Sequence, residues 1–162
     1  MASSEDFQKV KDCLKPQDIF LKACNSFTDR DFDPRLEDVD NLVYQFAHVV
    51  KESEVTSILA DGIETHFYRV YIDLGCRFIL EEELQKKEPI VSATIEAQFC
   101  AEYLMADKEL DEEALKFYAL HNASYHVWPY WREYLMNMCN RFNLPKIPVP
   151  TMQIKAQNDE NP

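Results

Sequence analysis

The sequence has 162 residues and a formal net charge of −12, with 46% hydrophobic and 28% charged residues. A chain of this length most often forms one domain with a real hydrophobic core. The acidic balance argues against binding to duplex nucleic acid or to anionic membranes, which attract clustered basic residues. Only two glycines occur, Gly62 and Gly75, so the glycine-rich loops that bind phosphate in common nucleotide-binding folds are excluded.

The five cysteines are Cys13, Cys24, Cys76, Cys100 and Cys139, and none forms a CxxC pair. An odd number of scattered thiols is typical of a protein that is kept reduced. The N-terminus lacks an apolar core of signal-peptide length, and no uninterrupted apolar stretch is long enough to cross a membrane. These features predict a cytoplasmic protein that does not insert into membranes.

The N-terminal part of the chain predicts an arm followed by a short strand. Residues 1–15 are mixed and polar, so we expect a loosely ordered arm. From Gln17 a two-residue alternation places Ile19, Leu21 and Ala23 on one face of a strand.

A charged crossover follows at residues 26–40 and is interrupted by Pro34. It retains Phe27, Phe32 and Leu36. Exposed apolar side chains in an acidic loop are unusual and call for a functional explanation.

Apolar patterning predicts three further strands: a run that is apolar on both faces at 41–51, and alternating runs at 68–78 and 91–103. In the last two, one face is apolar and the other is polar, as in an antiparallel sheet with one buried face. A charged turn region, residues 81–89, connects these two strands. Residues 52–65 fit either a short helix or a loop.

Helical spacing begins after residue 107, where acidic residues favour a helix N-terminus. The longest helix is predicted at residues 127–142, with Pro129 in its first turn, where a missing N–H is tolerated. Prolines beyond this helix predict an extended arm, and residues 156–162 predict a disordered tail. Because strands come first and helices last, we expect an α+β fold, with helices on one face of an antiparallel sheet, in a single domain over residues 1–155.

The predicted long helix is unusually rich in aromatic residues and methionine. One apolar stripe, at three- and four-residue steps, consists of Trp128, Trp131, Leu135, Cys139 and Phe142. A second stripe, formed by Tyr130, Tyr134 and Met138, has no obvious partner within so small a domain. A cofactor pocket, an internal core and a subunit interface are the alternatives. An apolar surface over more than half of the helix circumference favours the interface.

No residue pattern indicates catalysis or a metal site. His121 and His126 lie five residues apart, so their imidazoles do not share one helix face. A nucleophile pair of Cys139 and His126 is the remaining enzymatic interpretation, but Cys139 lies on the apolar stripe, where cysteine usually acts as a small hydrophobe. We therefore predict a protein that is not an enzyme and that holds no metal.

Several segments carry a resemblance to a known family. The sequence WPYWREYLMNMCNRFNLP, residues 128–145, resembles the FPYARE…P segment of the SecB protein-export chaperones. Residues 7–23 look like the first strand of that family, and DFDP, residues 31–34, looks like its crossover loop. The resemblance covers about residues 7–150.

The resemblance implies a four-stranded antiparallel sheet with C-terminal helices on one face, assembled as a homotetramer that is a dimer of dimers. It also implies ATP-independent holding of unfolded chains in apolar grooves, without a cofactor. The clients would be secretory precursors or, as for divergent members that serve toxin–antitoxin systems, an antitoxin. The alternative is an oligomeric adaptor or structural protein that uses the same fold without holding clients.

The implied sites fall on two sets of residues. The client groove would be lined by Phe27, Phe32, Leu36, Leu42, Tyr44 and Phe46. The oligomer interface would use Ile19, Leu21, Trp128, Trp131, Leu135, Met138, Cys139 and Phe142.

A docking surface for the SecA motor would lie on the outer sheet face, which is acidic in the family. Asp18 and Glu96 match that pattern. Lys22 departs from it, because it stands where a second acidic residue of the first strand is expected.

Overall fold

The structure is a computed structural model that describes residues 2–152. Its elements along the chain are α1 (Ser4–Cys13), β1 (Leu14–Thr28), η1 (Val39–Asn41), β2 (Leu42–Ala60), β3 (Ile63–Leu80), η2 (Glu81–Gln85), β4 (Ala93–Met105), α2 (Glu112–Tyr118), the π-helical turn η3 (Ala119–Ala123) and α3 (Ser124–Arg141). The predicted tail, residues 156–162, lies outside the described residues.

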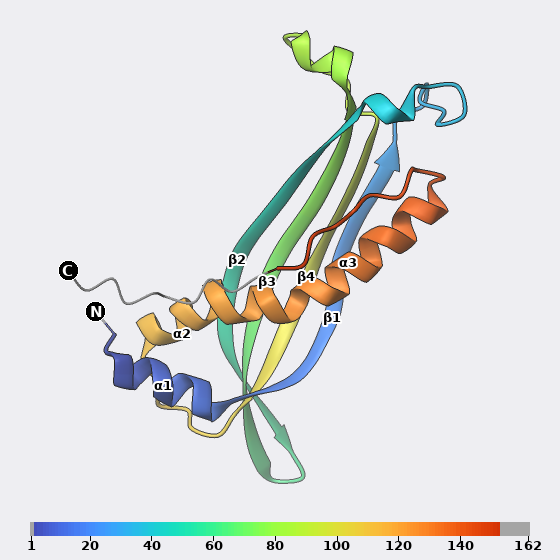
Figure 1. Ribbon diagram of the computed structural model, residues 1–162. Coiled ribbons are helices and arrows are strands. Elements are labelled where there is room, and N and C mark those ends of the chain that lie inside the picture. The colour runs from blue at the N-terminus through green and yellow to red at the C-terminus, as the bar shows by residue number, and fades with distance from the viewer. Residues whose placement is uncertain (1, 153–162) are drawn as a thin grey trace, which may run out of the picture.

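The four strands form one antiparallel sheet in the order β1-β4-β3-β2. The two edge strands, β1 and β2, are joined by the crossover at residues 29–41, which spans one end of the sheet (Figure 1). Helices α2 and α3 lie on one face of the sheet (Figure 1), which we call the helix-bearing face. The opposite face is the outer face. The predicted α+β fold with a four-stranded sheet is confirmed.

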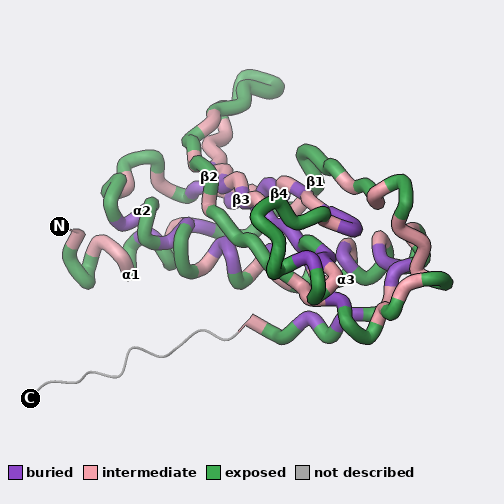
Figure 2. Tube along the Cα trace, turned by 90° about the horizontal axis from the view of Figure 1, so that it is seen from above, coloured by how far each residue is buried: buried purple, intermediate pink, exposed green. Residues whose placement is uncertain are grey.

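The core lies between the sheet and α3, and Figure 2 shows the buried residues concentrated where these two layers meet. The predicted alternation of β3 and β4 is confirmed, because every second residue is buried on the helix-bearing face. These side chains are Tyr68, Val70, Ile72, Leu74, Cys76 and Phe78 of β3, and Ala93, Ile95, Ala97, Phe99, Ala101 and Tyr103 of β4. A long run with one dry face specifies its register strongly, because a one-residue slip would expose every one of these side chains.

The expectation of a loosely ordered arm at residues 1–15 is wrong for its main part, which forms α1. Ser3 and Asp6 make a reciprocal capping box at the start of this helix. Phe7 packs edge-to-face on Phe117 of α2, and Val10 is fully buried. Packing on α2 provides the stability that so short and polar a helix lacks in isolation.

The prediction of a short helix or a loop at residues 52–65 is wrong. These residues form the end of a long hairpin of β2 and β3. Asp61 and Gly62 have φ values of 51° and 76° and make a two-residue turn. An Asp-Gly pair between strands is a strong hairpin signal, because such turns require positive φ at both positions. β4 pairs with β3 only from Phe67 onward, and Phe67 pairs with Thr56 of β2, so residues 57–66 project beyond the sheet as a two-stranded arm (Figure 1).

Replacing Gly62 with alanine is expected to destabilise this hairpin by about 1 kcal/mol, because a side chain is disfavoured at positive φ. Nothing lies within 4 Å of a Cβ built at this position, so the effect is one of the backbone alone. Amide hydrogen exchange of the arm measures it. Asp61→Asn is the control and should leave exchange unchanged, because asparagine tolerates positive φ equally well.

A bulge in β1 changes the faces predicted for its side chains. The register between β1 and β4 shifts between Leu21 and Ala23, which leaves Lys22 as the extra residue. Ile19 and Leu21 keep their predicted common face, but Ala23 pairs with Gln98 and moves to the outer face. Cys24 pairs with Ala97 and joins the helix-bearing face, which the alternation from Ile19 to Ala23 would have kept from it.

The long helix begins at Ser124, three residues earlier than predicted, and continues from α2 through η3. Pro129 therefore lies inside the helix and not in its first turn. It lacks the N–H that would bond the carbonyl of Tyr125. Asn143, with φ of 55°, ends the helix as expected.

Candidate functional site

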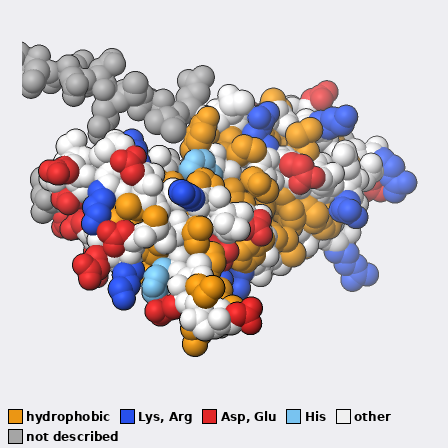
Figure 3. All heavy atoms as spheres, turned by 90° about the horizontal axis from the view of Figure 1, so that it is seen from below, with side chains coloured by type: hydrophobic (Ala, Val, Ile, Leu, Met, Phe, Trp, Pro, Cys, Tyr) orange, Lys and Arg blue, Asp and Glu red, His pale blue; other side chains and the backbone are white. Residues whose placement is uncertain are grey.

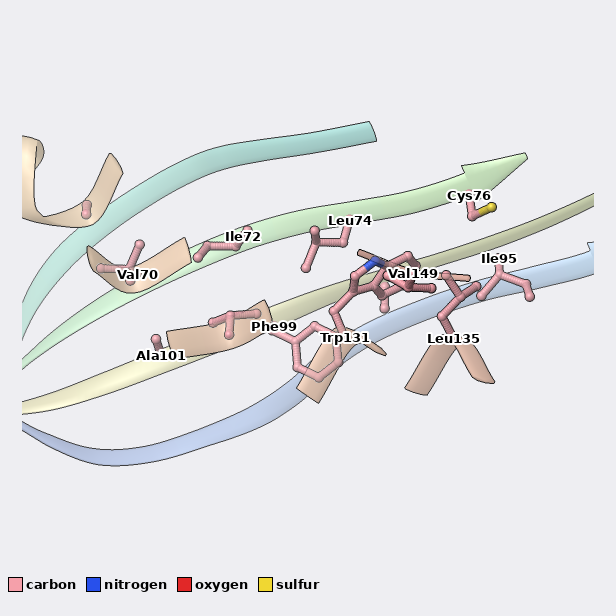
Figure 4. Close-up of a cluster of buried hydrophobic side chains, with 14 of the residues drawn as sticks. Val70, Ile72, Leu74, Cys76, Ile95, Phe99, Ala101, Trp131, Leu135 and Val149 are labelled. Atoms are coloured by element: carbon pink, nitrogen blue, oxygen red, sulfur yellow. The ribbon is translucent and has the colours of Figure 1, made fainter. Parts of the chain in front are cut away.

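The aromatic helix α3 places its most apolar stripe against its own sheet. Trp131 and Leu135 are fully buried and Cys139 is 1% exposed. Figure 4 shows Trp131 and Leu135 over the side chains of β3 and β4. The prediction that these three residues form an oligomer interface is wrong in this respect, since their side chains are packed in the core of one chain and are not presented to a partner.

The other predicted interface residues retain exposed surface. Leu21 is 43% exposed on edge strand β1, while Ile19, Trp128, Met138 and Phe142 are partly buried. Figure 3 shows hydrophobic side chains gathered over a broad area of the face seen from below, towards the end where β1 and α3 lie in Figure 1. Half-exposed apolar residues of α3 include Tyr130 and Met136, which add to the unpartnered apolar surface.

The predicted client-binding residues do not all lie on one surface. Leu42 is buried and belongs to the core, and Phe27 pairs with Thr94 and so lies on the outer face. Tyr44 and Phe46 lie on the helix-bearing face of β2, because their partners Phe78 and Cys76 are core residues. The structure thus brings Tyr44 and Phe46 together and separates Phe27 and Leu42 from them.

Exposure distinguishes the remaining candidates. Tyr44 packs edge-to-face on Phe78 at 5.4 Å, whereas Phe46 is 48% exposed at the sheet edge. In the crossover, Phe32 packs partly against the core, and Leu36 is 84% exposed. Phe27 is 49% exposed but lies on the outer face. Among the other predicted client residues, Leu36 and Phe46 therefore have the most apolar surface free to bind another chain.

The projecting arm carries exposed apolar residues that the sequence did not bring forward as a site. These are Ile58, Leu59 and Ile63, and Val55 adds exposed apolar surface just before the arm begins. The sequence analysis missed them because it interpreted residues 52–65 as a short helix or a loop and not as strands. The Asp-Gly pair at the turn was the signal that could have revealed a strand with an apolar tip.

The segment after α3, residues 144–152, runs back along the helix as an extended chain (Figure 1), and we call it the C-terminal strap. Leu144, Ile147 and Val149 are each 6% exposed and join the core. The indole Nε1 of Trp128 donates a hydrogen bond to the carbonyl oxygen of Pro150 at 2.7 Å. Figure 4 shows Val149 next to Trp131. The strap therefore covers part of the core that α3 leaves open.

The energetics of the strap are close to balance. Burial of its three aliphatic side chains contributes about 5–9 kcal/mol. Ordering the backbone of its six residues other than proline costs about 6–12 kcal/mol, and the three prolines cost little because their φ is already fixed. Because these two contributions nearly cancel, a competing chain can displace the segment.

The outer face has a shallow hollow of about 380 Å³ above Gly75, where the absence of a side chain lowers the floor. Asp73 and Glu96 line it, together with Ala47 and Val49. The Gln98 side-chain amide donates to Asp73 at 2.7 Å. Asp18 pairs with Glu102 across β1 and β4 and thus lies on the same face as Glu96. The two residues predicted for SecA-type docking therefore share one face.

The histidines act as separate structural groups. Tyr103 is 1% exposed, and its hydroxyl lies 2.9 Å from Nδ1 of His126. His48 of β2 lies 2.9 Å from the buried hydroxyl of Ser124, where β2 meets α3. His121 bonds the carbonyl of Phe117 in its own helix and does not converge with His126. Burial lowers the pKa of His126 and that of His48.

The thiol of Cys139 is unsuited to nucleophilic chemistry. Burial raises its pKa to about 11, so it stays protonated near neutral pH. Among residues 2–152, no group of three histidine, cysteine or acidic side chains is placed to hold a metal ion. No helix in this part of the chain combines the length and apolar character needed to span a membrane.

Acid is expected to destabilise the fold through His126. Because its pKa is below 6.5 in the folded state, the unfolded chain binds more protons, and stability falls as the pH drops below about 6.5. The free energy of unfolding in urea, measured between about pH 7 and 5.5, should decrease less in His126→Gln than in the original chain. An equal decrease in His126→Gln and in the original chain would contradict the assignment.

The sheet order, the crossover between its edge strands and the long C-terminal helix on one face define a SecB-like fold. One solved structure with this fold is similar over nearly the whole chain, namely the Mycobacterium tuberculosis Rv1957 SecB-like chaperone in complex with a ChAD peptide from the Rv1956 HigA1 antitoxin. The TM-score is 0.67 at 20% sequence identity, and the match covers 93% of this chain and 98% of the other. At this identity the similarity establishes the fold. No protein-family model and no curated protein sequence matches the chain.

Proposed function

We propose that the protein is an ATP-independent holdase of the SecB type, which binds extended or unfolded polypeptide segments and needs no cofactor. The observation that carries the proposal is the SecB-like fold with half-exposed aromatic surface at the edge of its sheet, above all Phe46 of β2. Apolar surface of this kind binds many sequences, because burial of apolar groups is non-directional.

The charge of the chain and the similar structure support a client class. A net charge of −12 disfavours acidic segments and favours neutral or basic ones. The Rv1957 structure contains an antitoxin peptide, which supports an antitoxin as the client and a dedicated toxin–antitoxin role. Secretory precursors are the second client class, and for them Asp18 and Glu96 on the outer face would serve SecA docking.

The functional form is proposed to be a cytoplasmic homotetramer, a dimer of dimers, of single-domain subunits. The β1 edge has unpaired backbone groups, and Leu21 adds exposed apolar surface there. Trp128, Met138 and Phe142 would contribute from α3. This interface would not include the buried residues of α3, which would only hold the helix on its sheet. These are Trp131, Leu135 and Cys139.

Two measurements test the proposal. Equimolar protein should suppress the aggregation of a slowly folding client in the absence of ATP, and unchanged aggregation would exclude a holdase. Multi-angle light scattering should give an oligomer, and a monomer at micromolar concentration would overturn the proposed assembly. An oligomer without suppression would favour the adaptor alternative.

A further inference from the structure

The C-terminal strap has the features of a bound peptide. Its chain is extended, it makes no regular secondary structure, and its buried side chains follow a spacing of three and then two residues, at Leu144, Ile147 and Val149. Lys146 and Pro148, which lie between them, are exposed. An extended chain with alternate apolar anchors is also the form in which unfolded segments bind apolar surfaces.

The end of the strap lies close to the candidate client residues. Trp128, which holds Pro150, is one helical turn from Ser124, and Ser124 lies 2.9 Å from His48 on β2. Phe46 is two residues from His48 on the same face of β2, and it is half exposed. The surface covered by the strap therefore leads to the exposed aromatic edge of the sheet.

We propose that the strap occupies, within its own chain, the surface on which a client segment binds, so that a client must displace it. The inference rests on the proposed holdase function and names its binding surface and its ligand. The ligand is an extended, uncharged or basic segment with apolar side chains at positions one, four and six. Clients that match this spacing would bind in preference, and the strap would keep weak competitors out.

Two variants distinguish the effect of releasing the strap from the effect of adding a negative charge. Val149→Asp puts a charge into the buried anchor position, which expels the strap. Thr151→Asp adds the same charge two residues later, at an exposed position of the strap, and is the matched control. Circular dichroism should show that both variants are folded.

The probe is a fluorescein-labelled synthetic peptide with the sequence of residues 143–152. It should bind Val149→Asp at least about tenfold more tightly than it binds the original chain, whereas Thr151→Asp should match the original chain. Equal affinity for the two folded variants would overturn the inference. A second peptide, with aspartate at the positions of Ile147 and Val149, should not bind.

Trp131 provides an independent readout that does not require Val149→Asp to fold. Trp128→Phe leaves Trp131 as the single tryptophan and removes the hydrogen bond to Pro150. In this variant, addition of a permanently unfolded client, reduced and alkylated with iodoacetamide so that its cysteines stay uncharged, should increase acrylamide quenching of Trp131 as the strap leaves. Client binding with unchanged quenching would overturn the inference.

The same unfolded client separates the inference from the function on which it rests. If Val149→Asp binds this client more tightly than Thr151→Asp does, the inference is supported. If both variants bind it equally, the strap inference fails and the holdase proposal stands. If neither variant nor the original chain binds it, the holdase proposal fails and the inference fails with it.

Discussion

Replacing Trp131 with alanine is expected to lower the free energy of unfolding by about 3–5 kcal/mol, because a fully buried indole is replaced by a cavity. Urea denaturation monitored by circular dichroism measures the loss. Tyr130→Ala is the matched control. Tyr130 is the preceding residue of the same helix but is 48% exposed, so its replacement should cost only about 0.5 kcal/mol.

This pair of variants also decides between a core role and an interface role for Trp131. A core residue affects unfolding at every protein concentration, whereas an interface residue acts through association and makes stability concentration-dependent. If Trp131→Ala dissociated the oligomer and left the stability of the subunit unchanged, the placement of Trp131 in the core would be contradicted.

Replacing Phe46 with serine is expected to weaken the binding of an unfolded client by roughly tenfold to a hundredfold, because a bound client would bury the aromatic ring, an effect of about 1.5–3 kcal/mol. The dissociation constant is measured by fluorescence anisotropy with a labelled, permanently unfolded polypeptide. The thermal melting temperature should change little, since Phe46 is already half exposed.

Leu59→Ser is the control for this loss. Leu59 is 73% exposed in the projecting arm, so its replacement removes comparable apolar surface at a distant site. The client affinity of this variant should remain unchanged. If Leu59→Ser weakened binding as much as Phe46→Ser, clients would be held by exposed apolar surface in general and not by the edge of β2.

The central strands and the class of the fold could be predicted because their pattern is long and regular. β3 and β4 alternate over many residues with one fully buried face, and only an antiparallel sheet covered by helices accommodates this. The apolar stripe of α3 could also be predicted from the sequence, but the surface against which it packs could not. Periodicity shows that Trp131 and Leu135 must be covered, and it does not show whether the cover is the same chain or another subunit.

Single residues that alter the regular pattern explain most of the remaining differences. The bulge at Lys22 reverses the faces of all later residues of β1, Phe27 included, and thereby separates Phe27 from Tyr44 and Phe46. The turn at Asp61 and Gly62 extends two strands into a region that looked irregular. In both cases the backbone conformation at one or two residues determines the direction of side chains many residues away. The spacing of apolar residues does not predict that conformation.

The candidate site was predictable in its composition but not in its extent. The apolar residues of the crossover and of β2 stood out as unusual in an acidic chain. Their grouping depends on tertiary contacts, because Leu42 is covered and Phe46 is not. The docking of residues 144–152 on α3 has no periodic signal either, because a proline-containing extended chain buries side chains only where a surface is already formed.

The most direct test of the holdase proposal is the affinity of the original chain for a permanently unfolded polypeptide, measured without ATP by isothermal titration calorimetry. We expect a dissociation constant in the micromolar range or below, with a negative heat-capacity change because apolar surface is buried. Phe46→Ser should weaken this binding in the same assay. No detectable heat at protein concentrations well above micromolar, from a protein that is folded and oligomeric, would contradict the proposal.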